Sequence, residues 1–239
     1  MLEDSAVERA LVVTAHPDDV DFGSAGTISL WTAAGVEVTY CVCTDGDAGG
    51  FDPAVPRADI PGIRRAEQEA AAKAVGVTDV RFLGYLDGQL TATLALRRDI
   101  SRVIRQVRPQ RMLIQSPERN WLRIGASHPD HLACGEAAMA AIYPDARNPF
   151  AHPELLRDEG LAEWTVAETW VMAHPESNHS VDVTDVFDAK LAALRAHVSQ
   201  TAHMEGFEER IREWFGLNAE AAGLPTGRLA ERFFVVETG

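Results

Sequence analysis

The chain has few cysteines and no long hydrophobic run. Cys41, Cys43 and Cys134 are an odd number of cysteines without Cys-x-x-Cys spacing. Cys41 and Cys43 alternate within an apolar segment, so we interpret them as small core residues. No apolar run is long enough to span a bilayer. The first residues, MLEDSAVERA, lack the apolar segment of a signal peptide. These absences predict a cytoplasmic protein without membrane contact.

Basic residues are also scarce. There are 22 Lys and Arg against 36 Asp and Glu, which gives a formal net charge of -14. Nucleic acids and anionic membranes are therefore excluded as expected partners, because both require a basic surface. The 239 residues are 46% hydrophobic, enough for one sizeable core, and we predict a single domain over 1–239. A homo-oligomer is compatible with this composition, which does not decide the oligomeric state.

Predicted strands and helices alternate along the chain, which is typical of an α/β fold with a largely parallel sheet. Strands are predicted at residues 9–14, 36–44, 80–83, 111–115, 168–172, 181–183 and 228–236. Helices are predicted at residues 23–34, 62–75, 94–107, 130–142, 185–200 and 205–215. The connection over 44–61 is long and rich in Gly, Asp and Pro, which is typical of a functional loop.

Two short runs contain most of the metal-ligating side chains. They are Ala15-His16-Pro17-Asp18-Asp19 and His128-Pro129-Asp130-His131. Both follow predicted strands, and in open α/β sheets ligands bind beyond the carboxyl ends of the strands. A hydrolytic zinc site needs imidazoles and a carboxylate as metal ligands, and a further carboxylate or imidazole as a base for the water. The alternative for either run alone is an ordinary turn or helix cap. Two runs on matching loops favour the metal site.

With these runs the chain resembles the PIG-L/LmbE-like family of zinc-dependent N-deacetylases. The resemblance extends to other motifs: Thr44-Asp45-Gly46, Arg64-x-x-Glu67, Asp182-Val183-Thr184, Lys190 and His197-Val198-Ser199-Gln200. It covers nearly the whole chain and is weakest between 143 and 166. It implies a Rossmann-like (LmbE-like) sheet with helices on both faces and a small C-terminal extension. It also implies hydrolysis of an N-acyl group, such as the N-acetyl of N-acetylglucosamine, from an amino sugar.

The resemblance also implies roles for individual residues. One Zn²⁺ per chain would be held by His16, Asp19 and His131. Asp18 would be the general base that deprotonates water. His128 would stabilise the oxyanion or protonate the leaving amine as an imidazolium, and Asp130 would orient His128.

Arg64 and Asp45 are expected to bind substrate, Arg64 through a hydroxyl or carboxylate and Asp45 through sugar hydroxyls. A solvated helix face and a turn are their respective alternatives. His174, His179 and His197 are left open as residues that could line the site.

One position departs from the family. Val20 stands where the family usually has Glu, and Asp21 follows it. If that Glu orients a metal ligand, its loss would weaken metal binding by about 10–100-fold. Asp21 is the candidate substitute, and the ligand set itself is intact.

Three other functions are compatible with the residues. The first is an amidase that acts on a larger thiol or antibiotic conjugate. The second is a non-catalytic metal-binding module of the same fold. The third is an iron(II) oxygenase, because two His and one carboxylate also form its ligand triad. Asp18 would have no role in the third function.

Overall fold

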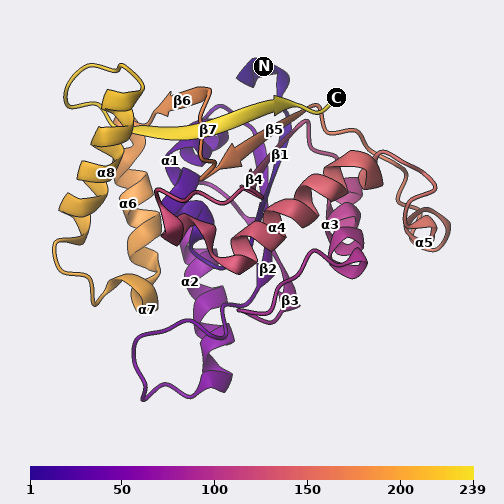
Figure 1. Ribbon diagram of the computed structural model, residues 1–239, viewed down its shortest axis with the longest axis horizontal. Coiled ribbons are helices and arrows are strands. Elements are labelled where there is room, and N and C mark those ends of the chain that lie inside the picture. The colour runs from indigo at the N-terminus through magenta and orange to yellow at the C-terminus, as the bar shows by residue number, and fades with distance from the viewer.

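A computed structural model describes all residues, 1–239, and contains one seven-stranded sheet with helices on both faces (Figure 1). The strands are β1 (Arg9–Thr14), β2 (Glu37–Thr44), β3 (Asp79–Tyr85), β4 (Arg111–Gln115), β5 (Glu168–Met172), β6 (His179–Asp182) and β7 (Ala230–Glu237). Their spatial order is β3-β2-β1-β4-β5-β7-β6. Strands β1 to β5 pair in parallel, and β7 runs antiparallel to both of its neighbours. The predicted α/β fold is confirmed.

Eight α-helices surround the sheet. They are α1 (Asp19–Ala33), α2 (Ile60–Ala74), α3 (Leu94–Val107), α4 (Pro129–Ala140), α5 (Pro153–Arg157), α6 (Phe187–Ala196), α7 (Val198–Thr201) and α8 (Phe207–Ala221). Helices α3 and α4 contact one face of the sheet, while α1 and α2 contact the other, where α6 packs on both of them. None of the helices is long and apolar enough to cross a membrane. The predicted C-terminal extension is part of the same sheet, because β6 and β7 continue it beyond β5.

The central strands are buried on both faces, as the near-continuous apolar sequence of a parallel strand indicates. In β1, Leu11 belongs to the core under α3 and α4, and Val12 belongs to the core under α1 and α2. Successive side chains of a strand point to opposite faces, so one short strand supplies both cores. All three cysteines are buried and free, which confirms their interpretation as core residues.

The helix boundaries differ from the predictions at two informative places. Helix α1 begins at Asp19 rather than residue 23, directly after Asp18, which has a left-handed backbone with φ 90°. The helix predicted over 185–200 is broken at His197, whose ψ of 63° is not helical and whose imidazole is fully buried. The backbone at Asp18 is held by a hydrogen bond to Gln68, and the His197 side chain is held by Asp21. Helical periodicity in the sequence does not reveal such long-range contacts.

The fold brings the two histidine runs to one edge of the sheet. Strand β1 lies between β2 and β4, and the chain visits β2 and β3 before it returns to β4 on the other side of β1. The order of strands therefore reverses between β1 and β4, and a crevice forms at such a point. His16 follows β1, and His128 follows β4 after a loop.

Candidate metal and catalytic site

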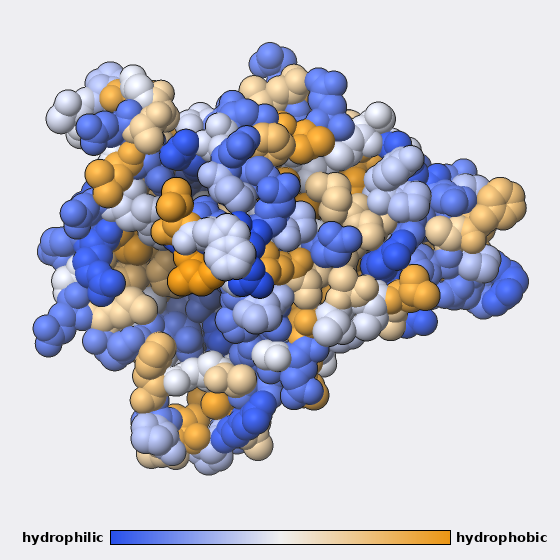
Figure 2. All heavy atoms as spheres, viewed as in Figure 1, coloured by the Kyte–Doolittle hydropathy of each residue, from blue (hydrophilic) through white to orange (hydrophobic).

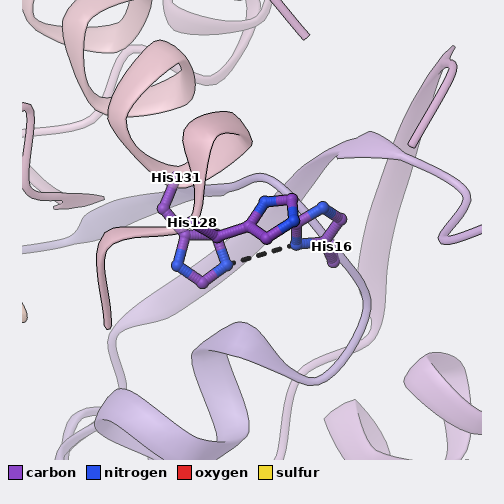
Figure 3. Close-up of side chains that lie close together, drawn as sticks. All are labelled: His16, His128 and His131. Carbon is purple, nitrogen blue, oxygen red and sulfur yellow. Dashed lines mark hydrogen bonds between the residues drawn. The ribbon is translucent and has the colours of Figure 1, made fainter. Parts of the chain in front are cut away.

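The start of helix α4 and the loop after β1 present the three histidines. Helix α4 begins with His128 as its N-cap and Pro129 as its first residue, a position where the missing N–H of proline costs nothing. His131 therefore lies in the first turn of α4. His16 comes from the loop after β1, and its backbone N–H donates to Oδ2 of Asp19 at 2.7 Å. Figure 3 shows the imidazoles of His16, His128 and His131 close together.

Three of the predicted ligand atoms converge. His16 Nδ1 lies 3.2 Å from His131 Nε2 and 3.4 Å from Asp19 Oδ2, and His131 Nε2 lies 2.9 Å from Asp19 Oδ1. In a tetrahedral zinc site with bonds of 2.0–2.2 Å, ligand atoms are separated by about 3.3 Å. The spacing of His16, Asp19 and His131 therefore fits a zinc ion without a large movement of any side chain.

The other side of each ligand imidazole is held by the protein. His16 Nε2 lies 3.0 Å from Asp87 Oδ1 and 3.2 Å from Asp130 Oδ2. His131 Nδ1 lies 3.3 Å from the carbonyl oxygen of Ala126. Metal-bound histidines characteristically donate their second N–H to a carboxylate or carbonyl, which fixes the ring and the tautomer. Nδ1 of His16 and Nε2 of His131 are thereby left for the metal.

The electrostatics of the cluster favour a cation. Burial opposes a positive charge on His16, yet Asp19, Asp130 and Asp87 together raise its pKa to about 12. Burial also opposes ionisation of Asp19, but the neighbouring His131 and His16 keep its pKa well below its usual range. The carboxylates around His16 and His131 form a negative environment that favours positive charge, and a metal ion bound to these imidazoles would have to displace their protons.

Two other groups of potential ligands share His16. The group His16, Asp87 and Asp130 uses Nε2, but Oδ2 and Oδ1 of Asp130 already accept hydrogen bonds from the N–H groups of Gly88 and Leu90 at 2.7 and 3.2 Å. The group with His128 lacks a carboxylate. The set with Asp19 differs from both groups, because it combines two imidazoles with a carboxylate that lies 3.4 Å from His16 Nδ1 and 2.9 Å from His131 Nε2.

Asp18 is strained and clamped beside the ligands. A non-glycine residue with φ 90° costs about 1–3 kcal/mol and persists only where neighbours enforce it. The Asp18 N–H donates to Gln68 Oε1 at 2.8 Å, and Arg64 Nη2 lies 3.0 Å from Asp18 Oδ2. Burial raises the pKa of Asp18 to about 6, although Arg64 opposes the shift. A carboxylate of that pKa is suited to accept a proton near neutral pH.

A buried network lies behind Asp18. Gln68 Nε2 donates to Asp21 Oδ2 at 2.9 Å, and His197 Nε2 lies 2.8 Å from the same oxygen. Asp21 and His197 are both fully buried, and Val20 is part of the core. Asp21 therefore does not reach a metal ligand, as the family's Glu was expected to do. It holds Gln68, and through Gln68 it supports the backbone of Asp18.

His128 differs from its predicted state. Its Nδ1 accepts a hydrogen bond from the backbone N–H of Asp130 at 3.2 Å, so its proton is on Nε2. Burial lowers the pKa of His128, and His16 and His131 lower it further. These contacts favour a neutral imidazole rather than an imidazolium. The expectation that the Asp130 carboxylate orients His128 is also corrected, because that carboxylate contacts His16.

The predicted substrate-binding residues have protein partners. Arg64 is buried and, besides Asp18, donates to the carbonyl oxygen of Pro17. Both oxygens of Asp45 accept from Arg65, at 2.8 and 2.6 Å. Asp87 and Gln68 were not predicted. Asp87 lies in an Asp-Gly turn just beyond the end of β3. Its position after a strand was the sequence signal that could have identified Asp87 as a site residue.

A cavity of about 690 Å³ opens beside the metal ligands, and Asp19 and His131 form part of its wall. In Figure 2 the surface is hollowed left of centre, between the side formed by α8 and the middle of the molecule. Of the three histidines left open, His174 lines this cavity. His179 packs against Trp170 with ring centroids 4.7 Å apart, and His197 belongs to the buried network.

Comparison with known proteins finds relatives in sequence and in structure over most of the chain. Residues 11–142 match the family described as PIG-L: GlcNAc-PI de-N-acetylase. A probable N-acetyl-alpha-D-glucosaminyl L-malate deacetylase 2 of Bacillus cereus is 35% identical, covering 90% of this chain and 92% of that protein. A diacetylchitobiose deacetylase of Thermococcus kodakarensis is 32% identical, covering 81% of this chain and 70% of that protein. The structure of N,N'-diacetylchitobiose deacetylase from Pyrococcus horikoshii matches with a TM-score of 0.88 and 29% identity, covering 97% of this chain and 85% of that one.

Proposed function

Because this chain belongs to the PIG-L family, we propose that it is a zinc-dependent deacetylase that hydrolyses the N-acetyl amide of an amino-sugar substrate. The observation that carries the proposal is the convergence of His16, Asp19 and His131 with the strained carboxylate of Asp18 beside them. The named relatives are deacetylases of acetylated amino sugars, which supports the same substrate class here.

The reaction is the hydrolysis of an amide. Water adds to the acetyl carbon, the carbon–nitrogen bond breaks, and acetate and the free amino sugar are released. A zinc ion bound to His16, Asp19 and His131 would act as a Lewis acid and make water acidic enough to lose a proton near neutral pH.

The chain's own residues divide the remaining work. Asp18 takes the proton of the attacking water, because it is a carboxylate of raised pKa next to the ligands. His128 Nε2 carries the proton that donates a hydrogen bond to the developing oxyanion. Arg64 holds the Asp18 carboxylate at 3.0 Å, and its buried guanidinium favours the ionised form of that carboxylate. A leaving amine needs a proton, and the proton that Asp18 accepts is available for it.

The strain at Asp18 favours an enzyme over a non-catalytic metal-binding module. A binding module requires the three ligands only, and it has no use for a residue with φ 90° that Arg64 and Gln68 must hold. Strained backbone of this kind is characteristic of active sites.

Acetate release tests the proposal. The zinc-loaded protein should release acetate from methyl N-acetylglucosaminide, and removal of zinc with a chelator should stop the release until zinc is restored. A zinc-loaded protein that releases no acetate from any N-acetyl amino-sugar glycoside would refute the proposed function.

A further inference from the structure

A buried ion pair contacts the helix that carries Asp19. Lys190 of α6 and Glu231 of β7 are both fully buried, and Lys190 Nζ lies 2.8 Å from Glu231 Oε1. Helix α6 packs on α1 beside the sheet (Figure 1). Neither residue of the pair lines the cavity beside the metal ligands, so the pair is not a substrate contact of that cavity.

The lysine holds the first turn of α1. Lys190 Nζ also donates to the carbonyl oxygens of Asp21 and Phe22, at 2.8 and 2.9 Å. An ammonium group has three N–H donors and no acceptor, so three contacts use its whole hydrogen-bonding capacity. The N–H groups of Asp21 and Phe22 donate in turn to the carbonyl oxygen of Asp18, at 2.9 and 3.0 Å. Two successive residues therefore connect Lys190 to the backbone of Asp18.

The glutamate holds the second turn of the same helix. Glu231 Oε1 accepts from the Gly26 N–H at 2.9 Å, and Oε2 accepts from the Thr27 N–H at 2.7 Å. A side chain at residue 26 would crowd this approach, because its Cβ would lie 3.1 Å from Glu231 Oε1 and 2.7 Å from Val183. Glycine at this position therefore lets the carboxylate reach the helix backbone.

Together the two side chains contact both partners of one helical hydrogen bond. In a regular α-helix the N–H of residue 26 donates to the carbonyl oxygen of residue 22. Here Lys190 donates to that carbonyl oxygen, and Glu231 accepts from that N–H. Side chains that insert into this ladder are one cause of helix kinks. The ion pair is therefore placed to set the direction of the first turn, which bears Asp19, relative to the rest of α1.

We propose that Lys190 and Glu231 are positioning residues that hold the first turn of α1 against the ligand histidines. The inference rests on the proposed function, because it takes His16, Asp19 and His131 as the zinc ligands. Zinc requires its ligand atoms at set distances, and a tilt of the first turn changes the 2.9 Å between Asp19 Oδ1 and His131 Nε2. The pair acts through the backbone of α1 and not through contact with zinc or substrate.

The test removes both buried charges together. Lys190→Met/Glu231→Gln deletes the contacts to the first turn without leaving a buried charge unpaired. Replacing both partners of a buried ion pair costs far less stability than removing one of them. Arg111→Met/Glu168→Gln is the matched control, because Arg111 and Glu168 are also buried and 2.8 Å apart. That pair lies at the amino end of β4, whereas the metal ligands follow the carboxyl ends of strands.

Three measurements separate positioning from stability. Zinc Kd is measured by competition with a chelator of known affinity, at a temperature where circular dichroism shows the variants folded. The visible spectrum of bound Co²⁺ reports the geometry of the metal ligands. Acetate release at saturating zinc gives kcat.

The double variant Lys190→Met/Glu231→Gln should bind zinc about 10–100-fold more weakly, which is the usual cost of losing a group that orients a metal ligand. Its Co²⁺ spectrum should shift, and its kcat at saturating zinc should fall because Asp18 moves with the turn. Glu231→Gln alone leaves Lys190 on the first turn, so its zinc Kd should lie between those of the wild type and the double variant. The control pair should lower the melting temperature and leave zinc Kd and the Co²⁺ spectrum unchanged.

A wild-type zinc Kd and Co²⁺ spectrum in the folded double variant would overturn the inference, and so would an equal loss of zinc affinity in the control. If the double variant does not fold, a wild-type zinc Kd and Co²⁺ spectrum in Glu231→Gln would overturn it.

The two proposals fail in distinguishable ways. Acetate release by the wild type, with unchanged zinc Kd in the double variant, would refute the positioning role and leave the deacetylase function standing. Weaker zinc binding in the double variant of a protein that releases no acetate would support the positioning role and refute the deacetylase function.

Discussion

Replacement of Gln68 by methionine tests whether the buried network positions Asp18. Methionine fills a similar volume, so the change removes hydrogen bonds rather than creating a large cavity. The Asp18 N–H loses its acceptor at 2.8 Å, and Asp21 Oδ2 loses a donor at 2.9 Å but keeps His197. An orphaned buried polar group costs about 1–3 kcal/mol, so two such losses should lower the free energy of unfolding by about 2–4 kcal/mol.

The same change should slow catalysis. Fewer contacts then hold the strained backbone of Asp18, whose conformation costs about 1–3 kcal/mol. The Asp18 carboxylate can therefore shift from its position beside the ligands. A displacement near 1 Å can cost about 100-fold in rate, and Arg64 remains to limit it, so kcat should fall by about 10–100-fold. KM should change little, because no cavity residue is altered.

The assay combines acetate release, zinc content by elemental analysis and thermal unfolding. Zinc content should stay at one per chain in Gln68→Met, since none of the three ligands contacts Gln68. Gln106→Met is the control, because Gln106 accepts from Arg81 at 2.8 Å in an exposed contact far along the chain from the site. A Gln68→Met variant with wild-type kcat would refute the positioning argument, and so would a loss of kcat fully explained by lost zinc.

The remaining predictions concern the ligands and the two catalytic groups. His16→Ala or His131→Ala should lose stoichiometric zinc while His152→Ala keeps it, and full zinc in both ligand variants would contradict the assignment. Asp18→Asn should keep zinc and lower kcat by about 10²–10⁴-fold, because an amide cannot accept the proton; a nearly normal kcat would remove Asp18 as the base. His128→Ala should keep zinc and lower kcat by about 10²–10³-fold, and His128→Gln should recover part because it keeps an N–H donor. The pKa of His128 is lowered, so its ring is neutral at pH 7. Replacement of His128 should therefore leave the alkaline limb of the pH profile of kcat/KM unchanged. A shift of the alkaline limb in His128→Gln would show that His128 acts as an imidazolium.

The sequence by itself determined the α/β class and the approximate strand positions, and it predicted a metal site at the two histidine runs. Alternating apolar segments report local backbone geometry, because a buried strand such as Arg9–Thr14 must be apolar on both faces. The meeting of the two histidine runs could be predicted because both follow strands, and parallel strands end at one edge of the sheet; the proposed ligands His16, Asp19 and His131 came from the family resemblance.

The tertiary structure alone decided how the site is supported. Gln68, Asp87 and His197 are far from the histidine runs in sequence, and no periodicity relates them to Asp18 or His16. The partner of a carboxylate depends on which backbone N–H groups and rings come within about 3 Å of it, which is why the carboxylate of Asp130 contacts the ring of His16 and not that of His128. Local sequence therefore predicts candidate ligands and catalytic groups, whereas long-range packing decides their orientation and their hydrogen-bond partners.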